Sequence, residues 1–559
     1  MKEPQGDRYP GLFQALMKQL SVAMKAEKRI MYLIISYALA VAFFSLIVPL
    51  TVQEMVSTFS YAVQPVMIWT LTAIMLTVLL FVGLFKTFHF YAIDVIQRRV
   101  FARITVAMVE QLPRNRFKTK QAQYLSNFFI ETVFMQRALS TLLFDLINVV
   151  VGGSVGMMLL MVYHPYYLMY NLLLMAGFAF TFFVLSRGAL KTTLDMSHAK
   201  YDVFRWVQEV AQNSLQFKAT DSRPFVLQRT NDLVNHYVDC RKARFRVLVR
   251  QYIGSVGGQA IAQAAALGIS GYLMAIGQLT LGQLVAVQAV VGALVINFDT
   301  LIKNMGFVYY FFTALTHLDE VFKQEQDYVS VESPVGMPKH LTQGVRVTCK
   351  GVSLVHGGAS VFDGFNLDVA PGEKLGIYAR TTAAKTALAR VLGGLETPTN
   401  GVVQYNGVDL RYMDPNGLSQ CRSVMIDSQL TLVDGTIEEN IVMGRSYVTY
   451  DDVSWALRFT ELEEDVEGLP RGVKSDISAL GESISPTHIV QILLARAILG
   501  RPQVLIFDGL IHSLEPSLRE RILRRLCSKD EAWSVIFVST DPNLTDHADR
   551  RIMLHHAHA

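Results

Sequence analysis

The chain has 559 residues, of which 51% are apolar, and its mean hydropathy is +0.30. This length allows two or three domains, and so positive a mean hydropathy excludes an ordinary soluble protein. The formal net charge of +4 comes from 51 basic and 47 acidic residues, and it gives no argument for binding to nucleic acid.

The apolar residues gather in the first 310 positions, in four runs that carry no charged residue. These runs are Met31–Val52, Tyr61–Phe85, Leu146–Ser186 and Gln251–Phe298. Because a helix needs about 20 apolar residues to cross a bilayer, each of the first two runs predicts one span. The last two runs are twice as long and are broken near His164-Pro165 and Gly277-Gln278. We therefore expect six transmembrane helices, rather than the core helices of a large soluble protein.

The distribution of Lys and Arg predicts the orientation of these helices. Segment 86–145 contains nine of these residues and segment 187–250 contains twelve, whereas the three short connections contain none. Basic loops stay in the cytoplasm. We therefore expect a multi-pass protein of the inner membrane, in contact with lipid, with both termini in the cytoplasm. All four cysteines, which fall on that side, are expected to be reduced thiols without metal-like spacing.

Residues 1–29 have apolar positions at helical spacing and predict an amphipathic helix along the inner membrane surface, with a merely solvated helix as the alternative. Residues 30–324 then form the predicted six-span domain. Its two long cytoplasmic segments keep a helical period, so we expect the spanning helices to extend into the cytoplasm. Each extension is broken in its middle, at 112–121 and at 219–226. These tips are expected to contact a soluble domain.

Two features of the last spans allow a functional or a purely structural interpretation. Small residues recur four apart at Gly254 and Gly258 and again at Ala262 and Ala266, which fits either a pathway lining or close helix packing. Asp299 and Lys303 are also four apart. Such charges near a membrane suggest function, but we favour a self-satisfied pair at the interface.

The composition changes at about residue 325. Residues 325–345 are polar with two prolines and predict a linker. Residues 346–559 alternate short apolar strands with helical stretches, which predicts an α/β domain with a mainly parallel sheet. The expected strands are RVTCKGVSLV (346–355), KLGIYA (374–379), SVMI (423–426), QVLIFD (503–508) and SVIFVST (534–540).

The stretch YARTTAAKTAL (378–388) follows one of these strands, at the place of a phosphate-binding loop. Such a loop has the pattern Gly-x-x-x-x-Gly-Lys-Ser/Thr, because backbone N–H groups must crowd around phosphate. Here Lys385 and Thr386 are kept, but Ala379 and Ala384 replace the two glycines.

Six spans followed by this α/β domain resemble the half-transporters among the ATP-binding cassette (ABC) exporters, including bacterial multidrug and type I secretion exporters. The blocks GVSLVHGGASVFDGFNLDVAPGEKLGIYART, LVDGTIEENI, ILLARAILGRPQVLIFD and SVIFVST carry the resemblance by their order and spacing. It implies a helical membrane domain followed by a P-loop NTPase-like nucleotide-binding domain.

Some functional residues of the family have counterparts here. The resemblance places His356 where an aromatic residue stacks on adenine. It places Lys385 at the β- and γ-phosphates, and it makes Thr386 and Asp508 the residues that hold Mg²⁺. The implied nucleotide-binding residues besides His356 are Ala379, Arg380, Thr381, Thr382, Ala383, Ala384, Lys385 and Thr386.

Other functional residues of the family are missing. All three loop glycines are replaced, by Ala379, Thr382 and Ala384, and a β-carbon costs roughly 1–2 kcal/mol wherever such a glycine has a positive φ. Gly509 stands in place of the glutamate that polarises the attacking water, and Asp541 in place of the histidine at the γ-phosphate. The glutamine that reaches metal and water aligns with Ser428.

The signature motif, Leu-Ser-Gly-Gly-Gln in the family, aligns with Ile484–His488. Ser485 is kept, whereas Pro486 and Thr487 replace the two glycines. Ser-Pro predicts an N-cap followed by the first position of a helix. Pro486, however, has no N–H to donate to the nucleotide of a partner chain.

These losses predict a subunit of an exporter for an unknown substrate, with a degenerate and inefficient ATPase site that binds ATP and Mg²⁺ weakly or not at all. One alternative is a non-hydrolysing pseudo-ABC protein that acts as scaffold, regulator or assembly partner, and another is an ATPase homodimer that tolerates the changes. The resemblance implies a homodimer, or a heterodimer with another ABC half-transporter, and allows a periplasmic adaptor.

Overall fold

The structure is a computed structural model that describes residues 27–61, 65–111, 129–322, 344–427, 431–478, 484–541 and 546–554. The chain divides into two compact units, Met1–Glu325 and Gln326–Ala559. The predicted amphipathic helix, the break at 112–121 and most of the predicted linker lie outside the described residues.

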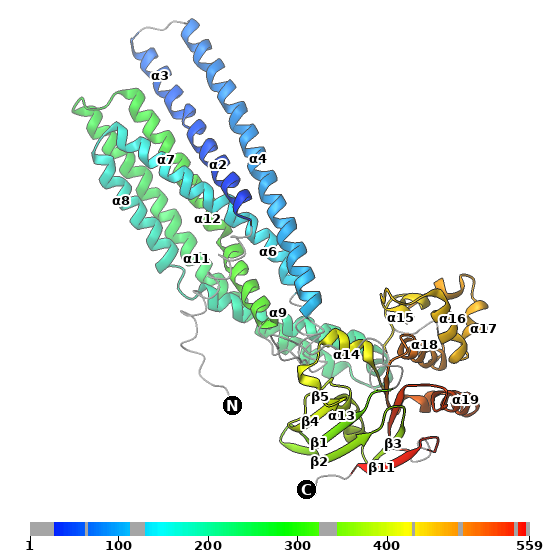
Figure 1. Ribbon diagram of the computed structural model, residues 1–559. Coiled ribbons are helices and arrows are strands. Elements are labelled where there is room, and N and C mark those ends of the chain that lie inside the picture. The colour runs from blue at the N-terminus through cyan, green and yellow to red at the C-terminus, as the bar shows by residue number, and fades with distance from the viewer. Residues whose placement is uncertain are drawn as a thin grey trace. The chain divides into compact units, whose positions relative to one another are not determined.

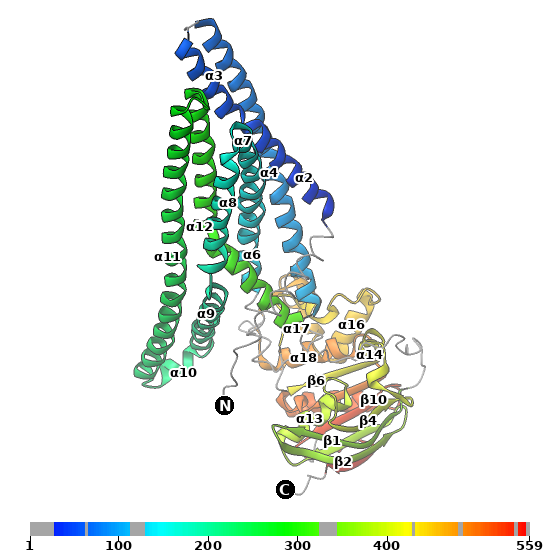
Figure 2. The same ribbon diagram turned by 90° about the vertical axis from the view of Figure 1, so that its left-hand side faces the viewer.

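The first unit consists of long helices that run side by side (Figures 1 and 2). Two π-helical turns, η2 and η3, interrupt its third and fourth long stretches. In chain order the elements are α2 (Lys28–Ser45), α3 (Ile47–Tyr61), α4 (Pro65–Gln111), α6 (Phe129–Thr141), η2 (Leu142–Leu146), α7 (Ile147–Tyr163), α8 (Tyr166–Ala179), η3 (Phe180–Val184), α9 (Ala189–Gln212), α10 (Ser214–Ala219), α11 (Arg223–Ala275) and α12 (Leu281–Phe322).

Five described stretches are long and apolar enough to cross a membrane. They are Lys28–Thr58, Pro65–Glu110, Phe129–Tyr163, Tyr166–Gln212 and Leu281–Leu318. The remaining predicted span is the uncharged second half of α11, from Gln251 to Ala275, where glutamines and small residues lower the hydropathy. Large apolar side chains such as Val66, Trp69 and Leu80 are exposed on α4, as expected for a surface that faces lipid.

The small residues on α11 serve mainly to pack this helix within the chain. A β-carbon at Gly254 would clash with Leu185, whereas one at Gly258 would meet nothing within 4 Å. Ala262 and Ala266 are buried. The packing interpretation therefore holds for three of these four positions. At Gly254 the side chain of Leu185 occupies the place that a β-carbon would take.

Asp299 and Lys303 form the predicted ion pair, at 2.6 Å along α12. The amide of Gln259, on α11, also donates to Asp299 at 3.1 Å. The acid is thereby satisfied inside the helical unit, in agreement with the structural interpretation.

A fully buried carboxylate joins the extensions of three helices. Glu131 on α6 accepts hydrogen bonds at one oxygen from Ser197 (3.1 Å), Lys200 (2.7 Å) and Tyr201 (2.8 Å), all on α9. Ser197 in turn lies 3.2 Å from the buried His317 on α12. Since burying a charge is costly, these donors are what makes the position tenable.

The predicted break at 219–226 is present. The short helix α10 ends at Ala219 and α11 begins at Arg223, so the chain reverses between them. Trp206 of α9 closes this tip, since its indole donates to Thr230 at 2.8 Å. The contact of this tip with the soluble domain stays a prediction.

The second unit is an α/β domain with two main sheets. A parallel sheet, β11-β3-β10-β9-β6, confirms the predicted mainly parallel arrangement. Its strands are β3 (Lys374–Ala379), β6 (Arg422–Ile426), β9 (Val504–Asp508), β10 (Ser534–Ser539) and β11 (Arg550–Leu554). Every residue of β9 and β10 is buried, as expected for central parallel strands.

An antiparallel sheet, which the sequence did not predict, has the order β2-β1-β4-β5. It consists of β1 (Val347–His356), β2 (Ala359–Val369), β4 (Asn400–Tyr405) and β5 (Val408–Asp409), and a small ladder pairs β7 (Gly435–Thr436) with β8 (Asp476–Ile477). The predicted strand at 346–355 therefore exists but belongs to the antiparallel sheet.

Helices fill the space around the sheets. They are α13 (Thr382–Leu392), α14 (Pro415–Cys421), α15 (Ile437–Val442), α16 (Tyr450–Phe459), α17 (Glu463–Glu467), α18 (Pro486–Ile498) and α19 (Pro516–Leu526), with short 3₁₀ turns η4 (Leu410–Tyr412), η6 (Gly472–Lys474) and η7 (Leu510–Ser513). The buried face of α13 shares one hydrophobic core with β-strands of both main sheets. A second core joins α16, α18 and α19 to β9 and β10.

Candidate nucleotide site

The site begins where β3 ends and α13 starts. Thr381 is the N-cap of α13: its hydroxyl accepts from the N–H of Ala384 at 3.3 Å, and its carbonyl accepts from the N–H of Lys385 at 3.0 Å. Threonine is a preferred N-cap, so the sequence closes this turn with its own side chain. The loop therefore starts α13 as an ordinary capped helix.

The expected backbone strain does not arise in this loop. None of residues 379–386 has a positive φ, so the substitutions that replace glycine carry no left-handed penalty. The methyl groups of Ala379 and Ala384 are buried in the core between the sheets instead. Residues 380–383 are exposed. The three substitutions therefore add no left-handed strain to the loop.

Lys385 is turned inward, and its ammonium lies among carboxylates. Its Nζ is 3.1 Å from Oδ1 of Asp508 and 3.6 Å from Oδ2 of Asp427. The side chains of Lys385 and Asp508 are 5% and 0% exposed, whereas that of Asp427 is 46% exposed. The contact with Asp508 is an ion pair without hydrogen-bond alignment, since Oδ1 has no geometrically acceptable donor.

Thr386 also faces Asp508. Its hydroxyl donates to Oδ2 of the carboxylate at 2.7 Å. The three residues that the resemblance assigns to phosphate and Mg²⁺ are thus brought together by α13 and the end of β9. In this structure they bind one another.

Asp427 is a site residue that the sequence analysis missed. It directly follows β6, which pairs in parallel with β9, so its carboxylate emerges at the same edge as Asp508. The ends of parallel strands gather polar groups at one edge of a sheet. An acid right after a buried strand was the signal that could have identified it. The neighbouring Ser428 lies outside the described residues.

Gly509 follows Asp508 with a φ of +72°. A β-carbon here would lie 2.5 Å from Nζ of Lys385 and 3.6 Å from its Cε. The residue at the glutamate position therefore has left-handed backbone, and its missing side chain leaves space that the ammonium uses.

Asp541 follows the end of β10, which lies between β3 and β9 in the sheet. Its backbone N–H donates to the hydroxyl of Ser539 at 2.9 Å. A third carboxylate is thereby placed at the strand ends that carry Asp508.

His356 ends β1 and is more than half exposed. Its Nδ1 lies 3.4 Å from a carboxylate oxygen of Glu396. The ring is available at the surface, but its one described polar partner is an acid rather than a stacking group.

The signature segment forms the start of α18, as the sequence predicts. Ser485 is the N-cap, and its hydroxyl accepts from the N–H of His488 at 3.2 Å. Pro486 is the first residue of the helix. His488 lies 3.3 Å from Asp465, and Thr487 follows Pro486 in the first turn. Ser485 therefore caps its own helix.

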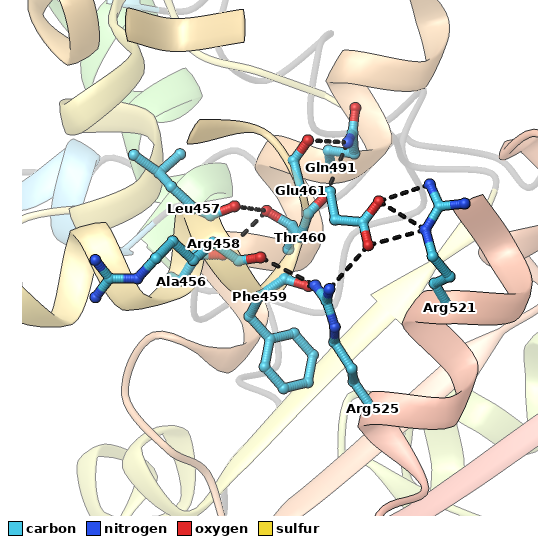
Figure 3. Close-up of polar contacts among 9 residues, drawn as sticks. All are labelled: Ala456, Leu457, Arg458, Phe459, Thr460, Glu461, Gln491, Arg521 and Arg525. Carbon is cyan, nitrogen blue, oxygen red and sulfur yellow. Dashed lines mark hydrogen bonds and ion pairs between the residues drawn. The ribbon is translucent and has the colours of Figure 1, made fainter. Parts of the chain in front are cut away.

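A polar network behind this turn ties α18 to two other helices, as Figure 3 shows. The amide of Gln491 donates to the carbonyls of Thr460 (2.8 Å) and Glu461 (3.2 Å). The carboxylate of Glu461 accepts from Arg521 at 2.7 Å and pairs with Arg525 at 2.9 Å. The hydrogen bond from Arg521 is the main reason why the pKa of Glu461 is lowered. These contacts hold the signature helix α18 in place within the domain.

Comparisons with known proteins agree with this architecture. The family model for the ABC transporter matches residues 362–511. The alpha-hemolysin translocation ATP-binding protein HlyB of Escherichia coli O6:H1 is 25% identical over 319 residues, which cover 56% of this chain and 44% of that protein. The transport/processing ATP-binding protein ComA of Streptococcus pneumoniae is 29% identical over 210 residues, 37% of this chain and 29% of that protein.

The fold is that of a solved exporter. A bacterial Atm1-family ABC exporter with ATP bound superimposes with a TM-score of 0.84 over 94% of this chain and 93% of that chain, at 16% identity. The chain spans less than half the length of the curated relatives it matches. It has the fold and domain order of an ABC exporter half-transporter, a multi-pass helical membrane domain followed by an α/β nucleotide-binding domain, and it is related to exporters such as HlyB.

Proposed function

We propose that this chain is a subunit of an ABC-type exporter that moves a substrate out of the cytoplasm, and that its own ATPase site is degenerate. The observation that carries the proposal is the state of the site: Gly509 supplies no side chain at the glutamate position, and Lys385 faces Asp508. The exporter fold supports the proposal that the chain takes part in transport, and the site residues support the proposal that its ATPase site is degenerate.

ATP and Mg²⁺ are the ligands that this type of domain implies, and the residue types still fit them in part. Lys385 suits phosphate, while Thr386 and Asp508 suit a Mg²⁺ ion. The ammonium of Lys385, however, is paired with Asp508. The N–H of Ala384 is bound to the cap at Thr381. The hydroxyl of Thr386 donates to Asp508 and keeps its oxygen lone pairs for a metal ion. A phosphate group would have to displace the contacts of Lys385 and Ala384, which predicts weak binding.

Hydrolysis would suffer more than binding. Phosphoryl transfer depends on preorganised groups around the transferring phosphate and the attacking water. Gly509 cannot orient that water, and Asp541 brings a negative charge to the place of a histidine. Each group of this kind accounts for a few kcal/mol of barrier, and about 1.4 kcal/mol already changes the rate tenfold. We infer that turnover by this site alone is negligible.

The chain is proposed to work as a dimer, either with itself or with another ABC half-transporter. Six spans are half of an exporter pathway in this family, and each composite ATP site combines the P-loop of one subunit with the signature of the other. A periplasmic adaptor is a further proposed partner, because the curated relatives include translocation proteins. We also propose that the protein lies in the inner membrane, with both termini in the cytoplasm.

A second candidate is a non-hydrolysing pseudo-ABC protein that serves as scaffold, regulator or assembly partner. The signature segment favours it. Pro486 lacks an N–H to donate, and Ser485 accepts the capping hydrogen bond of its own helix. A partner with a complete P-loop would therefore still meet a damaged signature from this chain. Both composite sites are affected, whichever partner is present.

The test is ATP hydrolysis by the full chain in lipid nanodiscs, alone and with any ABC half-transporter encoded beside it. We expect no turnover above that of a Lys385→Ala control when the chain is alone. Turnover that appears only with the partner supports the exporter subunit, and none in either case supports the pseudo-ABC protein. Turnover of several per second by the chain alone, lost in Lys385→Ala, would contradict the degenerate site.

A further inference from the structure

Asp508 is a buried carboxylate that needs a positive partner in the absence of any ligand. It is fully buried at the end of β9, and an isolated charge in such a place is strongly unfavourable. Its described neighbours are the hydroxyl of Thr386 and the ammonium of Lys385. Only the ammonium can neutralise it, because a hydroxyl carries no charge.

The ammonium of Lys385 lies directly beside this carboxylate. The side chain is 5% exposed, and its Nζ is 3.1 Å from Oδ1 of Asp508 and 3.5 Å from the backbone carbonyl oxygen of Asp508. Asp427 lies on its more open side at 3.6 Å. Because Asp427 is about half exposed, solvent screens that second pair. The buried pair with Asp508 is therefore the one that fixes the side chain.

Gly509 provides the space for this arrangement. With a φ of +72°, its backbone takes a conformation that glycine adopts freely, and the place of a β-carbon lies 2.5 Å from Nζ of Lys385. A β-carbon at this position would require the ammonium to shift from its place beside Asp508. The glycine at the glutamate position and the inward lysine are thus two parts of one arrangement.

We propose that Lys385 is an internal counter-ion that stabilises the nucleotide-free domain, and that Gly509 is the residue that admits it. The lysine that reaches phosphate in related domains is used here to neutralise Asp508. A nucleotide would compete with Asp508 for the same ammonium. This role does not depend on whether the chain takes part in transport or hydrolysis.

The first test measures local stability without nucleotide. Hydrogen exchange is followed by mass spectrometry in peptides that cover α13 and β9, in the full chain in nanodiscs. Lys385→Met should speed exchange there by more than about tenfold, because it leaves a buried carboxylate uncompensated. Lys350→Met is the matched control, since Lys350 is exposed on β1 of the same domain. A lysine that merely awaits phosphate would show no difference from this control.

A double variant separates the pair from a general effect on folding. Asp508→Asn removes the charge that needs compensation. If Lys385 is its counter-ion, Lys385→Met should speed exchange far less in an Asp508→Asn background than in the wild type. Equal effects in both backgrounds would overturn the proposal.

The second test addresses Gly509 with a backbone control that the chain itself offers. Gly444 has a φ of +71°, nearly that of Gly509, but a β-carbon there would meet nothing within 4 Å. Alanine at both positions incurs the same left-handed penalty. Gly509→Ala should therefore speed exchange more than Gly444→Ala, and the excess should vanish in the Lys385→Met background. An equal effect of the two alanines would show that the lysine does not use this space.

ATP hydrolysis is measured on the same preparations, so the two proposals can fail separately. If the chain hydrolyses ATP rapidly but Lys385→Met still speeds hydrogen exchange, only the proposal of a degenerate ATPase site is contradicted. If hydrolysis is negligible but Lys385→Met exchanges like the Lys350→Met control, only the counter-ion proposal is contradicted.

Discussion

Restoring the two missing catalytic side chains should not restore hydrolysis. The perturbation is Gly509→Glu together with Asp541→His, which returns the family residues at both positions. The introduced carboxylate would start from left-handed backbone, at a cost of roughly 1–2 kcal/mol. Its β-carbon would also lie 2.5 Å from Nζ of Lys385. The ammonium would have to shift from its present place beside Asp508.

The cost of that displacement can be estimated from the pair it breaks. Removing the partner of a buried carboxylate altogether typically costs about 3–5 kcal/mol, which is the upper limit for this displacement. With the backbone term, the upper limit is about 4–7 kcal/mol, a large share of the roughly 5–15 kcal/mol that stabilises a typical domain. The introduced carboxylate would also have the displaced ammonium as its nearest charge. It would then pair with Lys385 instead of orienting water.

The assay is ATP hydrolysis by the wild type, both single variants and the double variant, in nanodiscs. Hydrogen exchange of β9 on the same samples reports the loss of local stability. Gly444→Glu is the control for the backbone term, because Gly444 has the same φ and open space around it. Turnover of several per second by the double variant, abolished by Lys385→Ala, would refute the reasoning.

Four further predictions concern the assembly and the scaffold. The chain should form a dimer in nanodiscs, and a monodisperse monomer with no partner found by crosslinking in cells would contradict this. Cysteines at the tip 220–224 should crosslink to cysteines in a nucleotide-binding domain, whereas the absence of any such crosslink would leave the tip without its expected role. Glu131→Gln should speed hydrogen exchange in α6 and α9 by about tenfold or more, because it weakens charge-assisted hydrogen bonds to a buried acid, while Glu209→Gln on the exposed face of α9 should not. Because the pKa of Glu461 is lowered in the folded state, its pair with Arg521 stabilises the domain fully above the ordinary glutamate pKa of about 4.5, and this stabilisation is lost as the pH falls through the lowered pKa. Glu461→Gln should therefore make hydrogen exchange in α19 less dependent on acid pH, and an unchanged pH profile would contradict this.

The elements at the site could be predicted from the sequence because burial and capping leave strong local patterns. KLGIYA became β3 with the predicted bounds, and VLIFD became β9 ending at Asp508. These strands are buried on both faces, so they appear as unbroken apolar runs. The start of α18 at Ser485 and Pro486 followed from the preference of these residues for the N-cap and first helical position.

The direction of Lys385 could not be predicted in the same way. A family pattern assigns a lysine to phosphate, but its position in the empty domain depends on the space at Gly509 and on the charge of Asp508, which are distant in sequence. The antiparallel sheet was missed because its strands pair across turns that leave one face exposed, with a weaker apolar pattern. The left-handed penalty, which the sequence analysis tied to a positive φ, does not apply because no residue from 379 to 386 has one.

The P-loop and the signature segment of this chain have one feature in common: their polar side chains make contacts inside the domain. At the P-loop, Thr381 caps α13 and Lys385 neutralises Asp508. At the signature, Ser485 caps α18, and the following proline has no donor to offer. In each case a side chain of the loop caps its own helix or pairs inside the domain, while Oδ1 of Asp508 still lacks an aligned donor. Under the proposed function, a nucleotide gains little from Lys385 unless it first separates that ammonium from Asp508.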